Sequence, residues 1–246
     1  VSLQVFKGET LGLVGESGCG KTTLGRTIMR LETPTHGELI FEGRNITNLK
    51  GRSLKELRKE IQIIFQDPYA SLNPRMTIEQ SLLEPMIVNK IFKTKKERLK
   101  RINYLLEKVG MSSDCLSRYP HEFSGGQRQR INIARTLTLS PKLIVCDESV
   151  SALDVSVQAQ VLNLLNDLKE EFKFTYIFIS HDLSVVKFIS DRIVVMNKGE
   201  IIEVNDALSI YKEPKSSYTQ QLIDAIPSGE LSRIIEIQEA KNMINE

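Results

Sequence analysis

The sequence predicts an α/β fold, in which a mostly helical segment interrupts a core of buried strands. Two observations support this prediction. Short apolar runs alternate with stretches of helical periodicity, as in parallel sheets covered by helices. Between about residues 67 and 141 the pattern changes to prolines followed by helices, and after Pro141 the α/β pattern resumes. We therefore expect a discontinuous core (1–66 and 142–227), a helical insertion (67–141) and a C-terminal tail (228–246), which is a polar helix candidate.

The bulk composition restricts the class of protein. The chain has 246 residues, of which 41% are hydrophobic and 26% charged, with a net charge of +2. This balance is typical of a globular domain and does not favour a nucleic-acid partner. Because the sequence has no apolar run of 18 residues and no signal-peptide pattern, we expect no membrane span and no export. The three cysteines lack metal or disulfide spacing, which indicates reduced thiols.

The first half of the chain supplies the start of the core. Leu11 to Val14 is an apolar run ending at glycine, and residues 21–30 have a helical pattern, which gives a strand–loop–helix unit. Residues 38–41 and 61–65 are predicted strands. In the insertion, helical spacing of apolar residues predicts a helix at 95–109.

The second half continues with a capped helix and further strands. Ser124 is expected to cap a helix that extends to about Leu139. The further elements are strands at 143–146, 175–179, 192–196 and 200–204, and a helix at 157–172. Asn197-Lys198-Gly199 predicts a hairpin turn between the last two strands.

Residues Gly15 to Thr22 match the phosphate-loop pattern G-x-x-x-x-G-K-[ST] at every fixed position. Glycines let successive N–H groups cradle phosphate oxygens, and the following helix adds its positive end. Lys21 is expected to reach the β- and γ-phosphates, and Thr22 to ligate Mg²⁺. The expected nucleotide contacts here are Gly15, Glu16, Ser17, Gly18, Cys19, Gly20, Lys21, Thr22 and Thr23. The alternative, a glycine-rich turn without a ligand, fits the strand and helix context poorly.

Asp147 and Glu148 follow an apolar strand, where the ligands of open α/β sheets bind. Asp147 is expected to hold Mg²⁺, and Glu148 to polarise the water that attacks the γ-phosphate. Two adjacent acids are a weak signal alone, since a solvated strand end has the same pattern. Gln66 ends another strand and is expected to touch Mg²⁺ or the attacking water. His181 ends a third strand and is expected to bond the γ-phosphate or orient the water.

Ser124, Gly125, Gly126 and Gln127 open a helix with small residues, which predicts a second anion site. The local alternative is a plain helix N-cap. A basic run from Lys90 to Arg101 also stands out, and it indicates either a solvated helix face or contact with anionic lipid headgroups.

These motifs, in this order, resemble the ATPase domain of ABC transporters over nearly the whole chain. The resemblance implies a P-loop NTPase fold with a RecA-like core and a helical subdomain, and ATP and Mg²⁺ as cofactors. In that family two ATPase domains pack head to tail. Ser124 to Gln127 would therefore contact ATP bound to a second ABC ATPase subunit, either an identical copy or a paralogue.

Finer patterns resemble the oligopeptide and dipeptide importers, notably the segments Ile63 to Arg75, Arg118 to Phe123, Ser151 to Gln160 and Tyr218 to Leu222. The resemblance implies an ATP-hydrolysing subunit on the cytoplasmic face of the membrane. Its partners would be two membrane-spanning permease subunits and, indirectly, an extracytoplasmic substrate-binding protein. A nickel importer is the nearest alternative, followed by a soluble ABC ATPase without a transport role.

Three departures from the family pattern accompany this resemblance. The phosphate loop lies so close to Val1 that we expect a truncated N-terminal strand, and no adenine-stacking residue can be named. Ser149 replaces the proline that usually follows the catalytic glutamate. No cysteine follows Cys146, so we expect no iron–sulfur centre.

Overall fold

The computed structural model describes residues 1–226, which divide into two compact units. The first unit contains residues 1–47 and 145–148 and the chain from residue 174 onwards, and the second contains residues 48–144 and 149–173. The boundary between them passes through strand β5 (Leu143–Asp147). The division predicted from the sequence has other boundaries and stays a prediction. The predicted tail, 228–246, lies outside the described residues.

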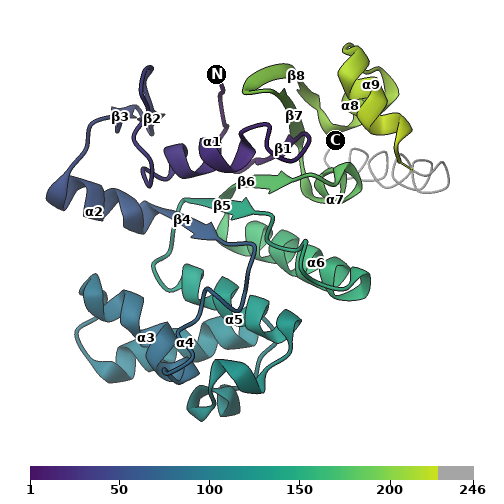
Figure 1. Ribbon diagram of the computed structural model, residues 1–246. Coiled ribbons are helices and arrows are strands. Elements are labelled where there is room, and N and C mark those ends of the chain that lie inside the picture. The colour runs from purple at the N-terminus through teal and green to yellow at the C-terminus, as the bar shows by residue number, and fades with distance from the viewer. Residues whose placement is uncertain (227–246) are drawn as a thin grey trace. The chain divides into compact units, whose positions relative to one another are not determined.

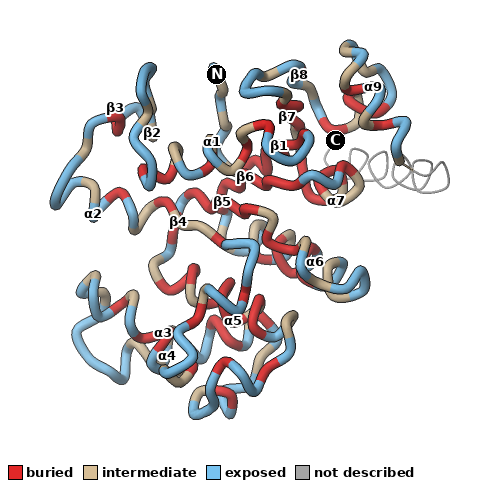
Figure 2. Tube along the Cα trace, viewed as in Figure 1, coloured by how far each residue is buried: buried red, intermediate tan, exposed pale blue. Residues whose placement is uncertain are grey.

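The first unit is built on a sheet with the strand order β5-β6-β1-β7-β8 (Figure 1). Besides β5, its strands are β1 (Thr10–Val14), β6 (Thr175–Ser180), β7 (Arg192–Asn197) and β8 (Glu200–Asp206). β1 pairs in parallel with β6 and β7, whereas β8 is antiparallel to β7. Every residue of β1, β5 and β6 is buried, as Figure 2 shows. The predicted strand at 143–146, buried on both faces, is therefore confirmed.

Helices cover both faces of this sheet. They are α1 (Lys21–Ile28), α7 (Leu183–Ile189), α8 (Ala207–Lys212) and α9 (Ser217–Asp224). A Cβ added to Gly25 of α1 would lie 2.8 Å from Ile179, and one added to Gly12 of β1 would lie 2.2 Å from Val186 of α7. Ile179 pairs with Leu13, the residue after Gly12. Because successive strand residues point to opposite faces, α1 and α7 cover opposite sides.

Two hairpins show where the sequence pattern was and was not sufficient. The predicted turn between β7 and β8 is confirmed, and Lys198 and Gly199 both have positive φ, as this hairpin type requires. The predicted strand at 38–41 is too long, because only Ile40–Phe41 (β2) pairs, with Arg44–Asn45 (β3). The N–H of Leu39 donates instead to the Thr47 hydroxyl.

The second unit is mainly helical. Its elements are α2 (Gly51–Glu60), β4 (Ile61–Ile64), α3 (Ile78–Val88), α4 (Lys95–Lys108), α5 (Gly125–Leu137) and α6 (Val155–Phe172), with 3₁₀ turns at Ser113–Ser117 and Pro120–Glu122. The predicted helices that correspond to α4, α5 and α6 are confirmed. The sequence did not predict α2 or α3, and α3 carries Pro85 in its interior, where a proline pattern indicates a break.

The core of the second unit joins these helices. Ile102 and Leu106 of α4 are fully buried, as their spacing predicted. At the other side of α4, the Tyr104 hydroxyl donates to Glu171 of α6 at 2.6 Å, and Lys108 pairs with the same carboxylate at 2.7 Å. None of the helices within residues 1–226 is both long enough and apolar enough to cross a membrane.

A Gly12→Ala substitution is expected to lower the free energy of unfolding by about 1–3 kcal/mol, the usual cost of overpacking a core. The new methyl group would lie 2.2 Å from Val186 Cγ1 and 2.5 Å from Ser190 Oγ. Denaturant unfolding of the two single variants and of the Gly12→Ala/Val186→Ala pair checks this. The pair should lose less than the sum of its parts. Strict additivity would contradict the close approach of β1 and α7.

Candidate functional site

The predicted phosphate loop connects β1 to α1 in the first unit. Gly15, Gly18 and Gly20 have φ values of 153°, 81° and 105°, in a backbone region that residues other than glycine rarely adopt. A Cβ on Gly15 would lie 2.1 Å from the carbonyl oxygen of Met196. The loop therefore keeps the bare backbone that a cradle of N–H groups requires, and it fits the phosphates of a nucleotide.

Lys21 places a positive charge inside this loop. Its side chain is buried, and Nζ donates to the carbonyl oxygens of Gly15 (2.8 Å) and Glu16 (2.9 Å). The same ammonium lies 3.8 Å from the sulfur of Cys19, which is also buried. The other predicted contacts in the loop, Glu16, Ser17, Gly18 and Thr23, are exposed. The loop thus combines one buried cation with a solvent-accessible backbone.

Thr22 and Asp147 join the loop to the end of β5. The Thr22 hydroxyl donates to Asp147 Oδ1 at 3.1 Å. Burial is the main cause that raises the pKa of the Asp147 carboxyl. The hydrogen bond from Thr22 opposes this rise, and the charge of Glu148 adds to it. A hydroxyl and a carboxylate oxygen this close are the donors that Mg²⁺ prefers beside a nucleotide phosphate, so the pair fits that ion.

Glu148 and His181 lie side by side beyond the strand ends. Nδ1 of His181 is 3.3 Å from Oε1 of Glu148. Glu148 has a φ of 48°, a left-handed conformation that is strained for a residue with a side chain, and its N–H donates to the carbonyl of Ile179 at 3.0 Å. Backbone strain of this kind concentrates at functional sites. The imidazole is in position to orient the carboxylate.

Two supports of the phosphate loop were missed by the sequence reasoning. The N–H of Glu16 donates to the Tyr218 hydroxyl of α9 at 3.2 Å, and the N–H of Gly199 donates to the carbonyl of Cys19 at 2.9 Å. Burial raises the pKa of Tyr218. Glu16 and Tyr218 are 202 residues apart, and no local pattern signals such a contact.

The remaining predicted residues belong to the second unit. Gln66 follows β4, and its amide Nε2 donates to the Ser151 hydroxyl at 3.3 Å. Ser124 is the N-cap of α5 and forms a capping box with Gln127: the Ser124 hydroxyl accepts from the Gln127 N–H at 3.3 Å, and the Gln127 side-chain oxygen accepts from the Ser124 N–H at 3.0 Å. The predicted N-cap is confirmed, whereas the anion site stays a prediction.

The two glycines after Ser124 have different neighbours. A Cβ on Gly126 would lie 2.5 Å from Val157 Cγ1 in α6, so this position must be glycine for α5 and α6 to pack as they do. A Cβ on Gly125 would be in ordinary contact with Leu153, at 3.4 Å. The segment 124–127, where an anion site is predicted, therefore also has a packing function through Gly126.

Polar side chains of α5 hold the chain that follows Gln66. The Arg128 guanidinium donates to the carbonyl of Phe123 and lies 3.5 Å from the centre of the Tyr69 ring. Asn132 donates to the carbonyl of Pro68 at 3.3 Å. The sequence reasoning missed these residues, although polar side chains recur along one face of α5. The helix that starts at Ser124 is thus bonded to the segment after Gln66.

The structure brings the predicted residues together in two groups. Lys21, Thr22, Asp147, Glu148 and His181 lie within the first unit, where Thr22 bonds Asp147 and Glu148 contacts His181. Gln66, Ser151 and the segment 124–127 lie within the second unit. The first group holds a cation, two metal-type oxygens and a carboxylate next to an imidazole, which is a set suited to binding and hydrolysing a nucleoside triphosphate.

Comparisons with known proteins agree with this chemistry. Residues 1–151 match the model of the ABC transporter family. The chain is 55% identical to the oligopeptide transport ATP-binding protein OppF of Bacillus subtilis, over 92% of this chain and 75% of that protein. It is also 55% identical to the dipeptide transport ATP-binding protein DppF of Lactococcus lactis, over 93% and 74%.

Solved structures of ATP-binding cassettes have a similar fold. A dimeric, post-hydrolysis cassette bound to ADP and Pi has a TM-score of 0.74 and 29% identity, and the match covers 83% of this chain and 88% of that one. The cbiO1 protein of Clostridium perfringens, part of the transporter complex cbiONQ, has a TM-score of 0.79 and 25% identity, with coverage of 97% and 90%. The predicted fold, a P-loop ATPase of the cassette type, is therefore confirmed.

Replacing Asp147 by Asn is expected to stabilise the nucleotide-free chain at neutral pH. Burial raises the pKa of this carboxyl, so its ionised form is less favourable in the folded chain than in the unfolded one. The gain should be largest at neutral pH and vanish as the pH falls below the ordinary carboxyl value of about 3.9.

Denaturant unfolding at a series of pH values measures this gain. Asp167→Asn, an exposed change on α6, is the matched control and should leave stability nearly unchanged at every pH. A gain from Asp147→Asn that does not vary with pH would show that its charge is not the cause.

Proposed function

The chain belongs to the ABC transporter family of ATPases, and from this premise we propose that it energises the import of oligopeptides or dipeptides. The observation that carries the ATPase function is the first group of site residues: Lys21 bonds the backbone of the phosphate loop, Thr22 bonds Asp147, and Glu148 contacts His181. The peptide class follows from relatives at 55% identity whose names specify oligopeptide and dipeptide transport.

In the proposed reaction, the chain binds ATP at the phosphate loop and hydrolyses it to ADP and phosphate. Lys21 neutralises the β- and γ-phosphates, and Thr22 and Asp147 provide oxygens for Mg²⁺. Bound Mg²⁺ would withdraw charge from the phosphate oxygens. Glu148 accepts a proton from the attacking water. The oxygen of that water then bonds to the γ-phosphorus, while the bond between the γ-phosphorus and the β-phosphate oxygen of ADP breaks. His181 holds the Glu148 carboxylate in the orientation that this transfer needs.

The second group of residues has a role in a dimer. We assign Ser124, Gly125, Gly126 and Gln127 to the ATP bound by a second ABC ATPase subunit, either an identical copy or a paralogue. The first-turn N–H groups of α5 have no acceptor within the helix, which leaves the glycine amides available for an anion. A dimeric cassette with ADP and Pi among the similar structures supports this assignment.

The same proposal defines the other partners and the location. Two membrane-spanning permease subunits would receive the movement of the ATPase dimer, and an extracytoplasmic binding protein would deliver the peptide. The chain would then lie on the cytoplasmic face of the membrane as a peripheral subunit.

Uptake by cells that lack this subunit tests the proposed transport function, with labelled dipeptides, oligopeptides and Ni²⁺ compared in parallel. Loss of peptide uptake supports the proposal, whereas loss of Ni²⁺ uptake alone would assign the chain to nickel import.

A Glu148→Gln variant is expected to bind ATP normally and to lose roughly 10²-fold or more of its turnover, the usual scale for removing a general base. The amide keeps the size of the side chain but cannot accept the proton. Phosphate release and binding of a fluorescent ATP analogue measure the two effects. Glu200→Gln, an exposed change on β8, is the control and should retain full turnover. Near-normal turnover of Glu148→Gln would exclude Glu148 as the base.

A further inference from the structure

The basic run between Lys90 and Arg101 does not form one uniform surface. Lys95 pairs with Glu79 at 2.7 Å, Arg98 donates to backbone carbonyls of the loop before α4, and Arg101 donates to a carbonyl at the end of α5. These three side chains therefore stabilise the second unit itself. Lys90 has no such partner, and it lines a pocket instead.

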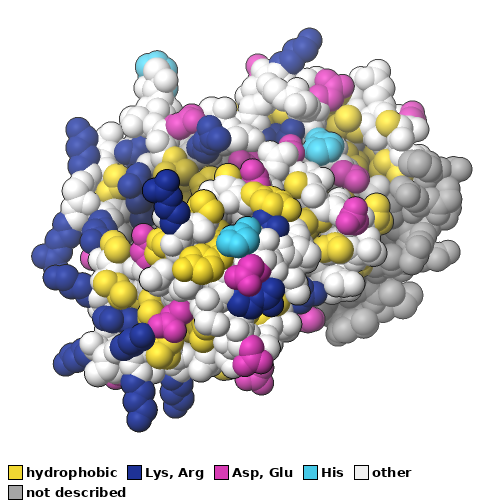
Figure 3. Space-filling view, turned by 60° about the horizontal axis from the view of Figure 1, so that its bottom comes forward, with side chains coloured by type: hydrophobic (Ala, Val, Ile, Leu, Met, Phe, Trp, Pro, Cys, Tyr) yellow, Lys and Arg dark blue, Asp and Glu magenta, His cyan; other side chains and the backbone are white. Residues whose placement is uncertain are grey.

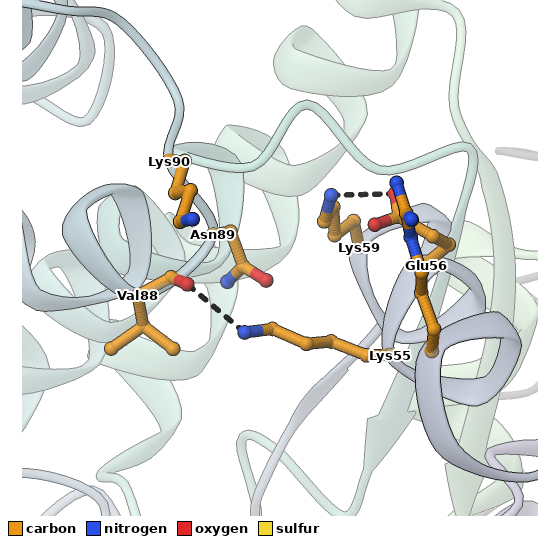
Figure 4. Close-up of a pocket in the computed structure, with 7 residues that line it drawn as sticks. Lys55, Glu56, Lys59, Val88, Asn89 and Lys90 are labelled. Atoms are coloured by element: carbon orange, nitrogen blue, oxygen red, sulfur yellow. Dashed lines mark hydrogen bonds and ion pairs between the residues drawn. The ribbon is translucent and has the colours of Figure 1, made fainter.

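This pocket lies within the second unit, between α2 and the end of α3, and has a volume of about 360 Å³ (Figure 4). Its lining residues are Arg52, Lys55, Glu56, Lys59, Val88, Asn89 and Lys90. Four cationic side chains thus face one carboxylate. The volume is at the small end of the range for ligand sites, which suits a compact group.

The contacts within the pocket leave most of its positive charge uncompensated. Lys59 pairs with Glu56 at 2.5 Å, and this hydrogen bond is the main cause that lowers the pKa of Glu56. Nζ of Lys55 donates to the carbonyl of Val88 at 3.1 Å, which fixes its ammonium at the pocket wall. Within the described chain, neither the Arg52 guanidinium nor the Lys90 ammonium makes a hydrogen bond or an ion pair.

Phosphate is the ligand chemistry that this set of donors fits. Arg52 provides a planar fork that can bond two phosphate oxygens, and Lys55 and Lys90 add point charges. A left-handed backbone at Lys90, with a φ of 56°, turns the chain there directly after α3.

Apolar side chains beside the pocket indicate the source of that phosphate. Ile87, Val88 and Phe92 are exposed by 52%, 55% and 42%, and they flank Lys90 in the chain. Figure 3 shows Lys and Arg side chains gathered along the left edge of the molecular face drawn there. Exposed apolar residues next to a cluster of cations are typical of surfaces that contact anionic membranes.

We propose that the pocket binds the phosphate of an anionic phospholipid headgroup, with Arg52 and Lys90 as its principal contacts. Ile87, Val88 and Phe92 then meet the apolar side of the same lipid surface. The residues that line the pocket include none of those assigned to the nucleotide. Through this pocket the chain binds the membrane directly, with an affinity that depends on the charge of the lipids.

Co-sedimentation of the full chain with vesicles tests the proposal, using phosphatidylcholine alone or mixed with phosphatidylglycerol. The wild type should bind the anionic vesicles and not the neutral ones. The Arg52→Ala/Lys90→Ala pair should bind about 25-fold more weakly, since each basic residue near such a surface contributes about a fivefold factor. ATP hydrolysis should be unchanged, which confirms that the variant folds.

A matched pair of substitutions separates the pocket from general surface charge. Lys96→Ala/Lys100→Ala also removes two exposed cations, on α4 outside the pocket, and should retain nearly full vesicle binding. Equal losses in both pairs would overturn the pocket as the site.

Calorimetry with inorganic phosphate, at saturating MgADP, distinguishes the two sources of phosphate. A phosphate site that is lost in Arg52→Ala/Lys90→Ala, without any vesicle binding by the wild type, would assign the pocket to a soluble phosphate and overturn the lipid. If neither vesicles nor phosphate distinguish the variant from the wild type, the pocket binds no phosphate ligand.

Discussion

The hydrogen bond between Thr22 and Asp147 is the contact on which the chemistry of the first unit depends. It joins the start of α1 to the end of β5 across 125 residues of chain. Lys21 precedes Thr22 and is directed into the phosphate loop by the same helix start, while Glu148 follows Asp147 and meets His181. A single contact between the start of a helix and the end of a strand therefore links the cation, the oxygens that can ligate a metal and the proposed base.

Much of this arrangement was predictable because it is local. The loop from Gly15 to Thr22 has a fixed spacing, and acids at the ends of buried strands meet at one edge of a sheet. Ser124 and Gln127 have the spacing of a capping box, so the start of α5 was also predictable. Tyr218 could not be predicted as a support of the loop, because its contact with Glu16 arises only when distant segments pack.

Two positions in the helices of the second unit could not be predicted from local sequence preferences. The prolines of residues 67–94 indicate interruptions, yet Pro85 lies inside α3, where packing of Leu82 and Met86 outweighs the local preference of the residue. Arg128 is similar, since a charged residue in a helix is usually exposed, whereas here it is buried against the Tyr69 ring. In both cases tertiary contacts decide a position that local propensity does not.

Gly126 satisfies two demands with one residue, because α6 packs against it and the proposed anion site needs its backbone. The first demand applies whether or not the chain turns over ATP. A relative that had stopped hydrolysing ATP would still be selected to keep this glycine, or would have to replace Val157 with a smaller residue at the same time. Covariation between positions 126 and 157 would then reflect helix packing. Loss of the glutamate at position 148 would instead indicate that such a relative no longer hydrolyses ATP.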